Sequence, residues 1–142
     1  MNDKKEVLLI RRAGEVRNEA GWWSKPGGGV KFGETAEKAM IREMKEELDI
    51  EVEIVGYLPH TNHIINPTSP NRLRGTGTGG EKIEHWVALN FIAKIKSGQP
   101  KNMEPHKCDK IGWFAMDSLP EKITQTTAEP IKNYLEGKFL EF

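Results

Sequence analysis

The chain alternates between apolar runs and polar, glycine-rich stretches, and this pattern predicts strands interleaved with two helices. A short apolar run at residues 7–10 indicates a buried strand, which follows a turn-like polar start at residues 2–5. β-Branched and aromatic residues predict further strands around Trp22 and Trp23 and at residues 51–57, 85–95 and 111–114. We therefore expect an α/β layered domain rather than a helical bundle or a sandwich of sheets.

The clearest helix is predicted over residues 35–48, where apolar side chains recur at helical spacing. Thr35 suits the N-cap position, because its hydroxyl can accept a hydrogen bond from a free backbone amide. The apolar stripe of this helix consists of Met40, Ile41, Met44 and Leu48. A closing helix is predicted over residues 130–139, with Pro130 in its first turn.

Three stretches are predicted to lack regular structure. Residues 13–21 are polar and glycine-punctuated, and residues 26–29 must be irregular backbone. Residues 60–80 hold proline, asparagine, threonine and glycine with almost no apolar periodicity. Because structureless connections of this length are uncommon in compact domains, this segment is either a lid over a substrate site or a tolerated surface insertion.

Length and composition limit the classes of protein to consider. The chain has 142 residues, which fits one domain over residues 1–142. Its 21 basic side chains balance 21 acidic ones, which gives no support to a nucleic-acid polymer as a partner. Cys108 is the single cysteine, and the first residues do not resemble a secretory signal, so we expect a cytoplasmic protein. No apolar stretch approaches the roughly 20 residues that cross a bilayer, so no membrane partner is expected.

Three glutamates gather on one face of the main predicted helix. Glu43, Glu46 and Glu47 stand at i, i+3 and i+4, so their carboxylates project from one arc. On the helix alone, a solvated acidic face is the simpler explanation. The glycines at residues 27–29 favour a functional site instead, because backbone without a Cβ can approach metal and phosphate oxygens. Such carboxylates suit Mg²⁺ or Mn²⁺, whose coordination shell substrate phosphates complete.

The same segment resembles the Nudix box, a loop-helix-loop signature. Gly28, Glu34 and the run Arg42-Glu43-Met44-Lys45-Glu46-Glu47 stand at the offsets of that signature. The match departs once, at Asp49, where the family pattern has glycine in a left-handed conformation that aspartate also tolerates. Weaker similarity extends over roughly residues 5 to 135, and residues 84–87 and 100–108 resemble a MutT-like branch acting on nucleoside triphosphates.

The resemblance implies a Nudix-type α/β/α sandwich, with a mixed sheet between two main helices. It also implies that Glu43, Glu46 and Glu47 bind Mg²⁺, or Mn²⁺, with help from the Gly28 carbonyl. Arg42 would orient a neighbouring carboxylate, and Glu34 would brace the junction between loop and helix. In this reading Glu46, Arg42 and Glu43 are the catalytic candidates, and Glu46 or a residue from another loop takes the proton of the attacking water.

Further candidates lie outside the box. Glu84 is a candidate outer carboxylate or fourth metal ligand, because it precedes a strand and borders the long loop, although an exposed edge glutamate is about equally well supported. The tryptophans could stack a base, but burial in the core is the commoner role. The candidate substrate-binding residues are Gly27, Gly28, Gly29, Arg11, His63 and His85.

The resemblance implies hydrolysis of a pyrophosphate linkage in a nucleoside diphosphate linked to another group. A nucleoside triphosphate, ordinary or oxidised, giving nucleoside monophosphate and pyrophosphate is the first hypothesis. The alternatives are a pyrophosphatase for ADP-ribose or nucleotide sugars, and a Nudix-fold regulator that binds a nucleotide without cleaving it. The intact box favours catalysis, with a small-molecule nucleotide as the partner.

The resemblance also raises a question about the beginning of the chain. Proteins of this family usually carry another strand before the one predicted at residues 7–10, and here residues 2–5 look like the turn that would follow it. A domain without that strand exposes a sheet edge, which proteins usually cover, charge or pair. We therefore expect this position to be filled by another segment of the chain or by a second copy in a homodimer.

Overall fold

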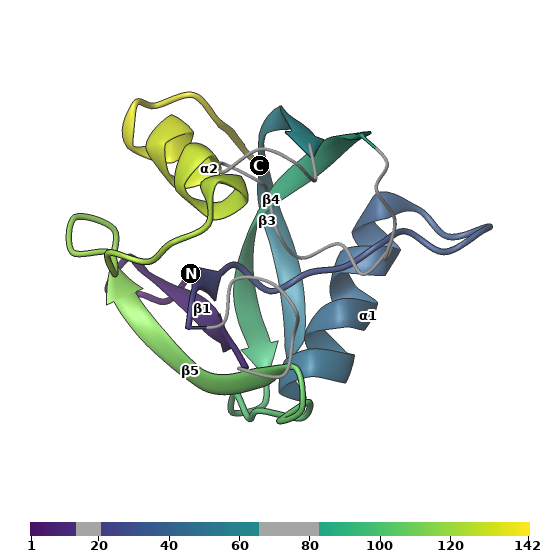
Figure 1. Ribbon diagram of the computed structural model, residues 1–142, viewed down its shortest axis with the longest axis vertical. Coiled ribbons are helices and arrows are strands. Elements are labelled where there is room, and N and C mark those ends of the chain that lie inside the picture. The colour runs from purple at the N-terminus through teal and green to yellow at the C-terminus, as the bar shows by residue number, and fades with distance from the viewer. Residues whose placement is uncertain (14–20, 66–82) are drawn as a thin grey trace.

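A computed structural model of the protein describes residues 1–13, 21–65 and 83–142, and Figure 1 shows how their elements are arranged. Two helices and six strands follow one another in these residues. In chain order they are β1 (Glu6–Arg12), β2 (Trp23–Ser24), α1 (Ala36–Leu48), β3 (Glu51–Ile65), β4 (Glu84–Ser97), β5 (Cys108–Ala115), α2 (Gln125–Leu135) and β6 (Leu140–Glu141).

The strands form two three-stranded antiparallel sheets, ordered β2-β1-β5 and β4-β3-β6. In the first sheet Leu8 lies opposite Trp113, and in the second Tyr57 lies opposite Phe91. One parallel bridge, between Trp23 and Ile123, adds parallel pairing to these antiparallel strands. Both helices contact β3, and Figure 1 shows α1 and α2 on opposite sides of the β3–β4 pair. The α/β layered fold expected from the sequence is confirmed.

Helix α1 forms because its sequence supplies a cap at each end and one apolar face. The Thr35 hydroxyl accepts from the Lys38 amide at 3.2 Å, as predicted for an N-cap. Asp49 ends the helix in the left-handed region with a φ of 54°, and its amide donates to the Lys45 carbonyl. The aspartate thus adopts the conformation that the family pattern assigns to glycine.

The core lies between α1 and the two sheets. Met44 and Leu48 of α1 are buried with Ile50 and Val52, and Leu8 and Ile10 of β1 pack against this cluster. The predicted apolar stripe is wrong at Ile41, which is 42% exposed, while Ala39 is buried instead. The helix therefore presents a slightly rotated face to the core.

Strand β3 is longer than predicted, and residues 60–65 of the expected loop belong to it. Thr61 and His63 are buried while Asn62 and Ile64 are exposed, which is the two-residue period of a strand. Because the inward-facing side chains are polar, a search for apolar alternation could not find this extension. The remainder of the expected loop and most of the loop expected at residues 13–21 lie outside the described residues.

Helix α2 begins at Gln125, five residues before its predicted start, so the expectation that Pro130 lies in its first turn is wrong. Proline has no amide hydrogen, so the carbonyl four residues earlier, that of Thr126, lacks its helical donor. Lys25 fills that place, because its ammonium donates to the Thr126 carbonyl. The helix tolerates an internal proline because another element supplies the missing hydrogen bond.

The ends of the chain lie along the second sheet. The Asn2 carbonyl accepts from the Lys5 amide at 3.0 Å, which matches the predicted turn. The amino group of Met1 donates to the Ala93 carbonyl of β4 at 2.8 Å, and β6 pairs with β3 at Gly56 and Tyr57. The expectation that another segment of the chain or a second copy fills the place of the missing first strand stays a prediction.

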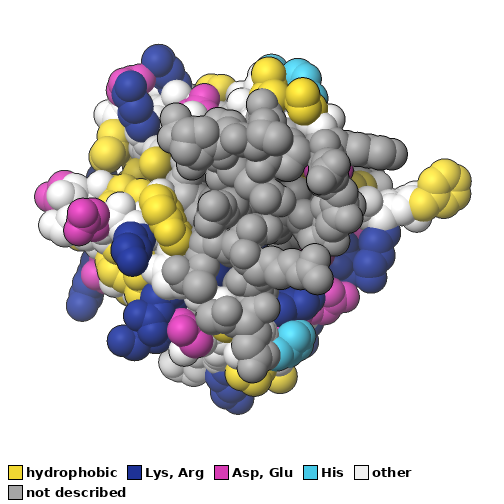
Figure 2. Space-filling view, viewed as in Figure 1, with side chains coloured by type: hydrophobic (Ala, Val, Ile, Leu, Met, Phe, Trp, Pro, Cys, Tyr) yellow, Lys and Arg dark blue, Asp and Glu magenta, His cyan; other side chains and the backbone are white. Residues whose placement is uncertain are grey.

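The described surface mixes charges of both signs. Figure 2 shows lysine and arginine side chains interspersed with acidic ones around the visible part of one face, as the balanced composition suggests. None of the helices described here has the length and apolarity that crossing a membrane requires.

Replacing Leu48 tests the core. Leu48 is fully buried in the central cluster, so Leu48→Ala should lower the free energy of unfolding by about 2–5 kcal/mol through lost burial and the cavity left behind. Urea denaturation measures this change. Leu135→Ala is the matched control, because Leu135 is 59% exposed and should change stability by less than about 1 kcal/mol. Equal losses in both variants would contradict this assignment of the core.

Candidate active site

The glycine loop at residues 27–29 packs directly against two glutamates of α1. The Gly27 amide donates to Glu47 Oε2 at 3.3 Å. A Cβ at Gly28 would lie 2.3 Å from Glu43 Oε1, so a larger residue would require the Glu43 carboxylate or the loop to shift. Glycine at position 28 lets the backbone and this carboxylate approach closely as they stand.

Arg42 joins this loop to the helix through its guanidinium group. It binds both oxygens of Glu34, at 2.7 and 3.1 Å, and its NH2 nitrogen also donates to the Gly29 carbonyl at 3.0 Å. The NH1 nitrogen donates to Glu43 at 2.9 Å and to Glu46 at 3.2 Å. The bidentate pair lowers the pKa of Glu34 to about 2, chiefly through the hydrogen bonds from Arg42. The bracing role of Glu34 and the orienting role of Arg42 stay predictions.

Glu47 is a partly buried carboxylate whose pKa is strongly shifted. Burial, and then the negative charge of Glu43, raise its pKa to about 7, and Glu104 adds to the effect. Lys107, which pairs with Glu104 at 2.9 Å, partly offsets this negative charge. Two neighbouring carboxylates beside a glycine loop fit a divalent cation, which would neutralise both.

Glu46 shares the Arg42 NH1 nitrogen with Glu43 but is exposed to solvent. Its side chain is 49% exposed and lies 3.9 Å from the Lys31 ammonium, in addition to its contact with Arg42. Among the residues that the structure describes, no three acidic, histidine or cysteine side chains already converge as a metal site. Arg42 holds one oxygen of each of two predicted ligands, Glu43 and Glu46, and a carboxylate bonded in this way can still offer its other oxygen to a metal. The metal-ligand roles of Glu43, Glu46, Glu47 and Gly28 stay predictions.

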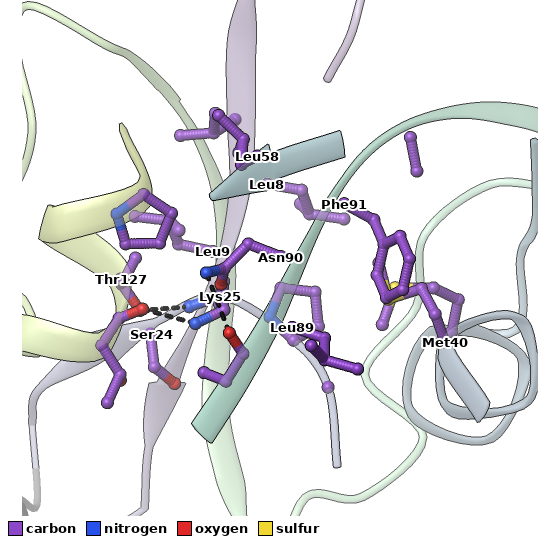
Figure 3. Close-up of a pocket in the computed structure, with 18 of the residues that line it drawn as sticks. Leu8, Leu9, Ser24, Lys25, Met40, Leu58, Leu89, Asn90, Phe91 and Thr127 are labelled. Carbon is purple, nitrogen blue, oxygen red and sulfur yellow. Dashed lines mark hydrogen bonds between the residues drawn. The ribbon is translucent and has the colours of Figure 1, made fainter. Parts of the chain in front are cut away.

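The glycine loop also forms one edge of a cavity of about 670 Å³ between the two sheets. That volume is within the range of about 300–1,000 Å³ usual for small-molecule sites. Figure 3 shows Met40 and Phe91 at one side of the cavity and a polar group at the other. We call this group the polar end, and it consists of Ser24, Lys25, Asn90 and Thr127.

Asn90 of β4 is buried at the polar end with only half of its amide satisfied. Its Nδ2 donates to the carbonyls of Pro59 and Ala88, at 3.0 and 3.3 Å, and to the Thr61 hydroxyl at 3.3 Å. Its Oδ1 is buried without a hydrogen-bond partner. The Thr61 hydroxyl also lies 2.8 Å from His63 Nε2. Burial lowers the pKa of His63, which keeps the imidazole neutral near pH 7.

Lys25 follows β2 and reaches toward the first turn of α2. Its backbone amide donates to the Thr127 hydroxyl at 2.8 Å, and its ammonium donates to the Thr126 carbonyl. Burial lowers the pKa of Lys25 from 10.5 to about 8, against the opposing effect of Glu129. The side chain is therefore mostly protonated at pH 7 but is held in an environment that disfavours its charge.

The structure gathers some of the predicted substrate-binding residues and separates others. Gly27, Gly28, Gly29 and His63 all line the cavity. Arg11 and His85 are not among its described lining residues. Arg11 pairs with Asp109 at 2.7 Å, and His85 lies 3.0 Å from Asn62 on the exposed side of the second sheet.

Glu84 begins β4, opposite Ile65, and accepts from the Trp86 indole at 2.9 Å. Its role as an outer carboxylate stays a prediction. Glu104, which the sequence reasoning did not single out, is the outer carboxylate whose charge acts on Glu47. Sequence reasoning also missed Lys25, Asn90 and Thr127. Of these, Asn90 had a local signal, because it interrupts an otherwise apolar run in β4.

Comparison with known proteins gives one consistent family. A family model described as NUDIX domain matches residues 1–134. The chain is 35% identical to the solved structure of a MutT NUDIX hydrolase from Burkholderia pseudomallei, with a TM-score of 0.73 over 93% of this chain and 89% of that one.

Two curated relatives are more distant. The chain is 29% identical over 119 residues to an uncharacterized Nudix hydrolase, YvcI, of Bacillus subtilis, covering 80% of this chain but 61% of that protein. It is 29% identical over 118 residues to an RNA pyrophosphohydrolase of Acinetobacter baylyi, covering 80% of this chain and 68% of the relative.

The buried amine of Lys25 generates a pH prediction. Because its pKa is about 8 in the folded protein and 10.5 is its ordinary value, the unfolded chain holds more protons between these pH values, and stability should rise with pH there. Lys25→Met lacks this dependence. From pH 7 to pH 10 the free energy of unfolding of the wild type should therefore rise by about 2 kcal/mol more than that of the variant. Denaturation at both pH values measures this difference. A stability difference that is the same at both pH values would contradict the enclosed position of the amine.

Proposed function

The chain belongs to the Nudix family, and from that premise we propose that it is a Mg²⁺-dependent pyrophosphohydrolase acting on a nucleoside triphosphate, ordinary or oxidised. The products would be a nucleoside monophosphate and pyrophosphate. The observation that carries this proposal is the position of the glycine loop, which touches Glu43 and Glu47 on one side and lines the cavity on the other. Phosphates held at this loop would leave the nucleoside facing the cavity.

The residues of the box would divide the work between holding a metal and positioning water. Glu43, Glu46, Glu47 and the Gly28 carbonyl are oxygen donors of the kind that Mg²⁺ takes, and the mutual repulsion of Glu43 and Glu47 supports a cation between them. When bound, Mg²⁺ neutralises phosphate charge and lowers the pKa of a bound water. Glu46 is the exposed carboxylate of the set and is our candidate to accept the proton of the attacking water.

Arg42 would act as a positioning residue in this scheme. It keeps the loop and the helix in register through Glu34 and the Gly29 carbonyl. Its bonds to Glu43 and Glu46 would fix the orientation of these carboxylates toward a cation.

Other substrates of the family are alternatives that the same experiment distinguishes. ADP-ribose and nucleotide sugars share the pyrophosphate linkage, and some relatives are named RNA pyrophosphohydrolase, which makes a triphosphate at an RNA end a further candidate. The balanced charge of the chain favours a small nucleotide over a polymer, and we expect it to act in the cytoplasm. A regulator that binds nucleotides without cleaving them would bind but not turn over.

A substrate panel tests the proposal. The protein is incubated with nucleoside triphosphates, oxidised nucleotides, ADP-ribose, nucleotide sugars and a short 5′-triphosphate RNA, each with Mg²⁺ or with excess chelator, and the products are separated by chromatography. We expect monophosphate and pyrophosphate from free triphosphates, and no turnover with chelator, because the phosphate charge is then not neutralised. Turnover confined to ADP-ribose, nucleotide sugars or RNA ends would overturn the assignment.

Neutralising the box carboxylates tests the mechanism. Glu46→Gln and Glu47→Gln should each lower turnover about 100-fold or more while the circular dichroism spectrum and thermal midpoint stay close to wild type, since neither side chain fills the core. Glu53→Gln is the matched control, because Glu53 is exposed on β3 away from the box. Near wild-type turnover for both box variants at saturating Mg²⁺ would remove these residues from the mechanism.

A further inference from the structure

We propose that Asn90 and Lys25 read the nucleobase of the substrate, and that they select bases in which a ring N–H stands beside a carbonyl group. Guanine, hypoxanthine, uracil and thymine have this oxo pattern, whereas adenine and cytosine present an amino group beside a ring nitrogen. The inference rests on the proposed function in one respect, since it takes the substrate to be a nucleotide.

The orientation of the Asn90 amide is fixed by its neighbours. Two backbone carbonyls, those of Pro59 and Ala88, lie within hydrogen-bond distance of Nδ2. Rotating the amide by half a turn would place Oδ1 against both carbonyl oxygens, which cannot donate a hydrogen. The nitrogen is therefore held on the strand side, and the oxygen is the group left over for a ligand.

That leftover oxygen is unusual, because Asn90 is only 4% exposed and its Oδ1 has no partner. Buried acceptors are nearly always hydrogen-bonded, since leaving one unsatisfied is costly. Asn90 lines the cavity that begins at the glycine loop. Because Oδ1 itself exposes almost no surface, a ligand in that cavity that offers an N–H group would satisfy the oxygen after a small movement of the side chains around it.

Lys25 supplies hydrogen-bond donors at the same polar end. One of its three N–H groups is used on the Thr126 carbonyl, the acceptor that Pro130 leaves without a helical donor. Its remaining hydrogens can be given to a ligand acceptor. Figure 3 shows Lys25, Asn90 and Thr127 on one side of the cavity, so this end of the cavity holds both an acceptor and a cationic donor.

This pairing favours oxo bases over amino bases for a chemical reason. An asparagine that reads adenine typically uses both its oxygen and its nitrogen, and here the nitrogen is occupied by backbone carbonyls. Lysine typically pairs with the carbonyl oxygen of guanine, where the hydrogen bond is charge-assisted. An acceptor at Asn90 and a cation at Lys25 therefore complement a ring N–H beside a carbonyl. Met40 and Phe91 at the other side of the cavity provide apolar surface for a planar ring.

Binding of nucleoside monophosphates to the full chain tests the inference without requiring catalysis. Titration calorimetry compares guanosine monophosphate, its 1-methyl derivative and adenosine monophosphate. The methyl group replaces the hydrogen that would be given to Asn90. We expect guanosine monophosphate to bind about tenfold or more tightly than either of the others, because each leaves a buried polar group unpaired.

Variants separate the two contacts. In Asn90→Leu the affinity for guanosine monophosphate should fall to that of the 1-methyl derivative. In Lys25→Met the preference for guanosine over adenosine monophosphate should fall to less than about threefold, because a charge-assisted hydrogen bond is lost. Asn133→Leu makes the same chemical change on α2 outside the cavity lining and should leave all three affinities unchanged.

Each outcome bears on one claim. Equal binding of the three monophosphates to the wild type, or no binding at millimolar concentration, would overturn the inference even if triphosphates are hydrolysed. A 1-methyl derivative that still binds more weakly than guanosine monophosphate to Asn90→Leu would assign the effect to steric exclusion and overturn the role of Asn90. Selective binding of guanosine monophosphate without hydrolysis of any triphosphate would support the base reading and remove the proposed function.

Discussion

The guanidinium of Arg42 is the contact on which the candidate site depends. One planar cation, 20% exposed, joins Glu34 and the Gly29 carbonyl of the loop to Glu43 and Glu46 of the helix. Without it, Glu34 and Glu43 would lose their ion pairs with the guanidinium, Glu46 would keep only its looser contact with Lys31, and the loop carbonyl would lose its donor. Because that loop also forms an edge of the cavity, the same contact sets where a substrate could pass from the carboxylates to the polar end. Lysine could not replace it, since a single ammonium cannot bind both oxygens of Glu34 while reaching the other acceptors.

Local signals in the sequence were enough to predict α1 and the box, because all the residues involved lie in one continuous segment. The cap at Thr35, the apolar side chains at Met44 and Leu48 and the left-handed Asp49 each depend on near neighbours in the chain. Elements that depend on distant partners were predicted less well. The second half of β3 is a strand because β4 pairs with it, up to Ile65 opposite Glu84, although its inward residues are polar. Helix α2 continues through Pro130 because Lys25, about a hundred residues earlier, bonds to the carbonyl that proline leaves free.

The polar end of the cavity was invisible to sequence reasoning for the same reason. Lys25, Asn90 and Thr127 come from three separate parts of the chain, and only the fold brings them together. Asn90 alone interrupts an apolar run, and a single asparagine in a strand has many structural explanations. The spacing of the box carboxylates identified the family, whereas the residues that would discriminate between substrates have no spacing to recognise.

The two ends of the site differ in how their buried polar groups are satisfied. At the box, Arg42 offsets the charges of Glu34, Glu43 and Glu46, whereas Lys107 offsets only part of the effect that raises the pKa of Glu47 to about 7. At the polar end, an acceptor without a partner and an amine with a lowered pKa both reduce stability in the absence of a ligand. A ligand with complementary groups removes both penalties, and a ligand with the wrong groups leaves them in place. The difference in binding free energy between those two ligands is the specificity of the site. The chemistry common to the family can therefore remain in the box while the base is selected at the far side of the cavity.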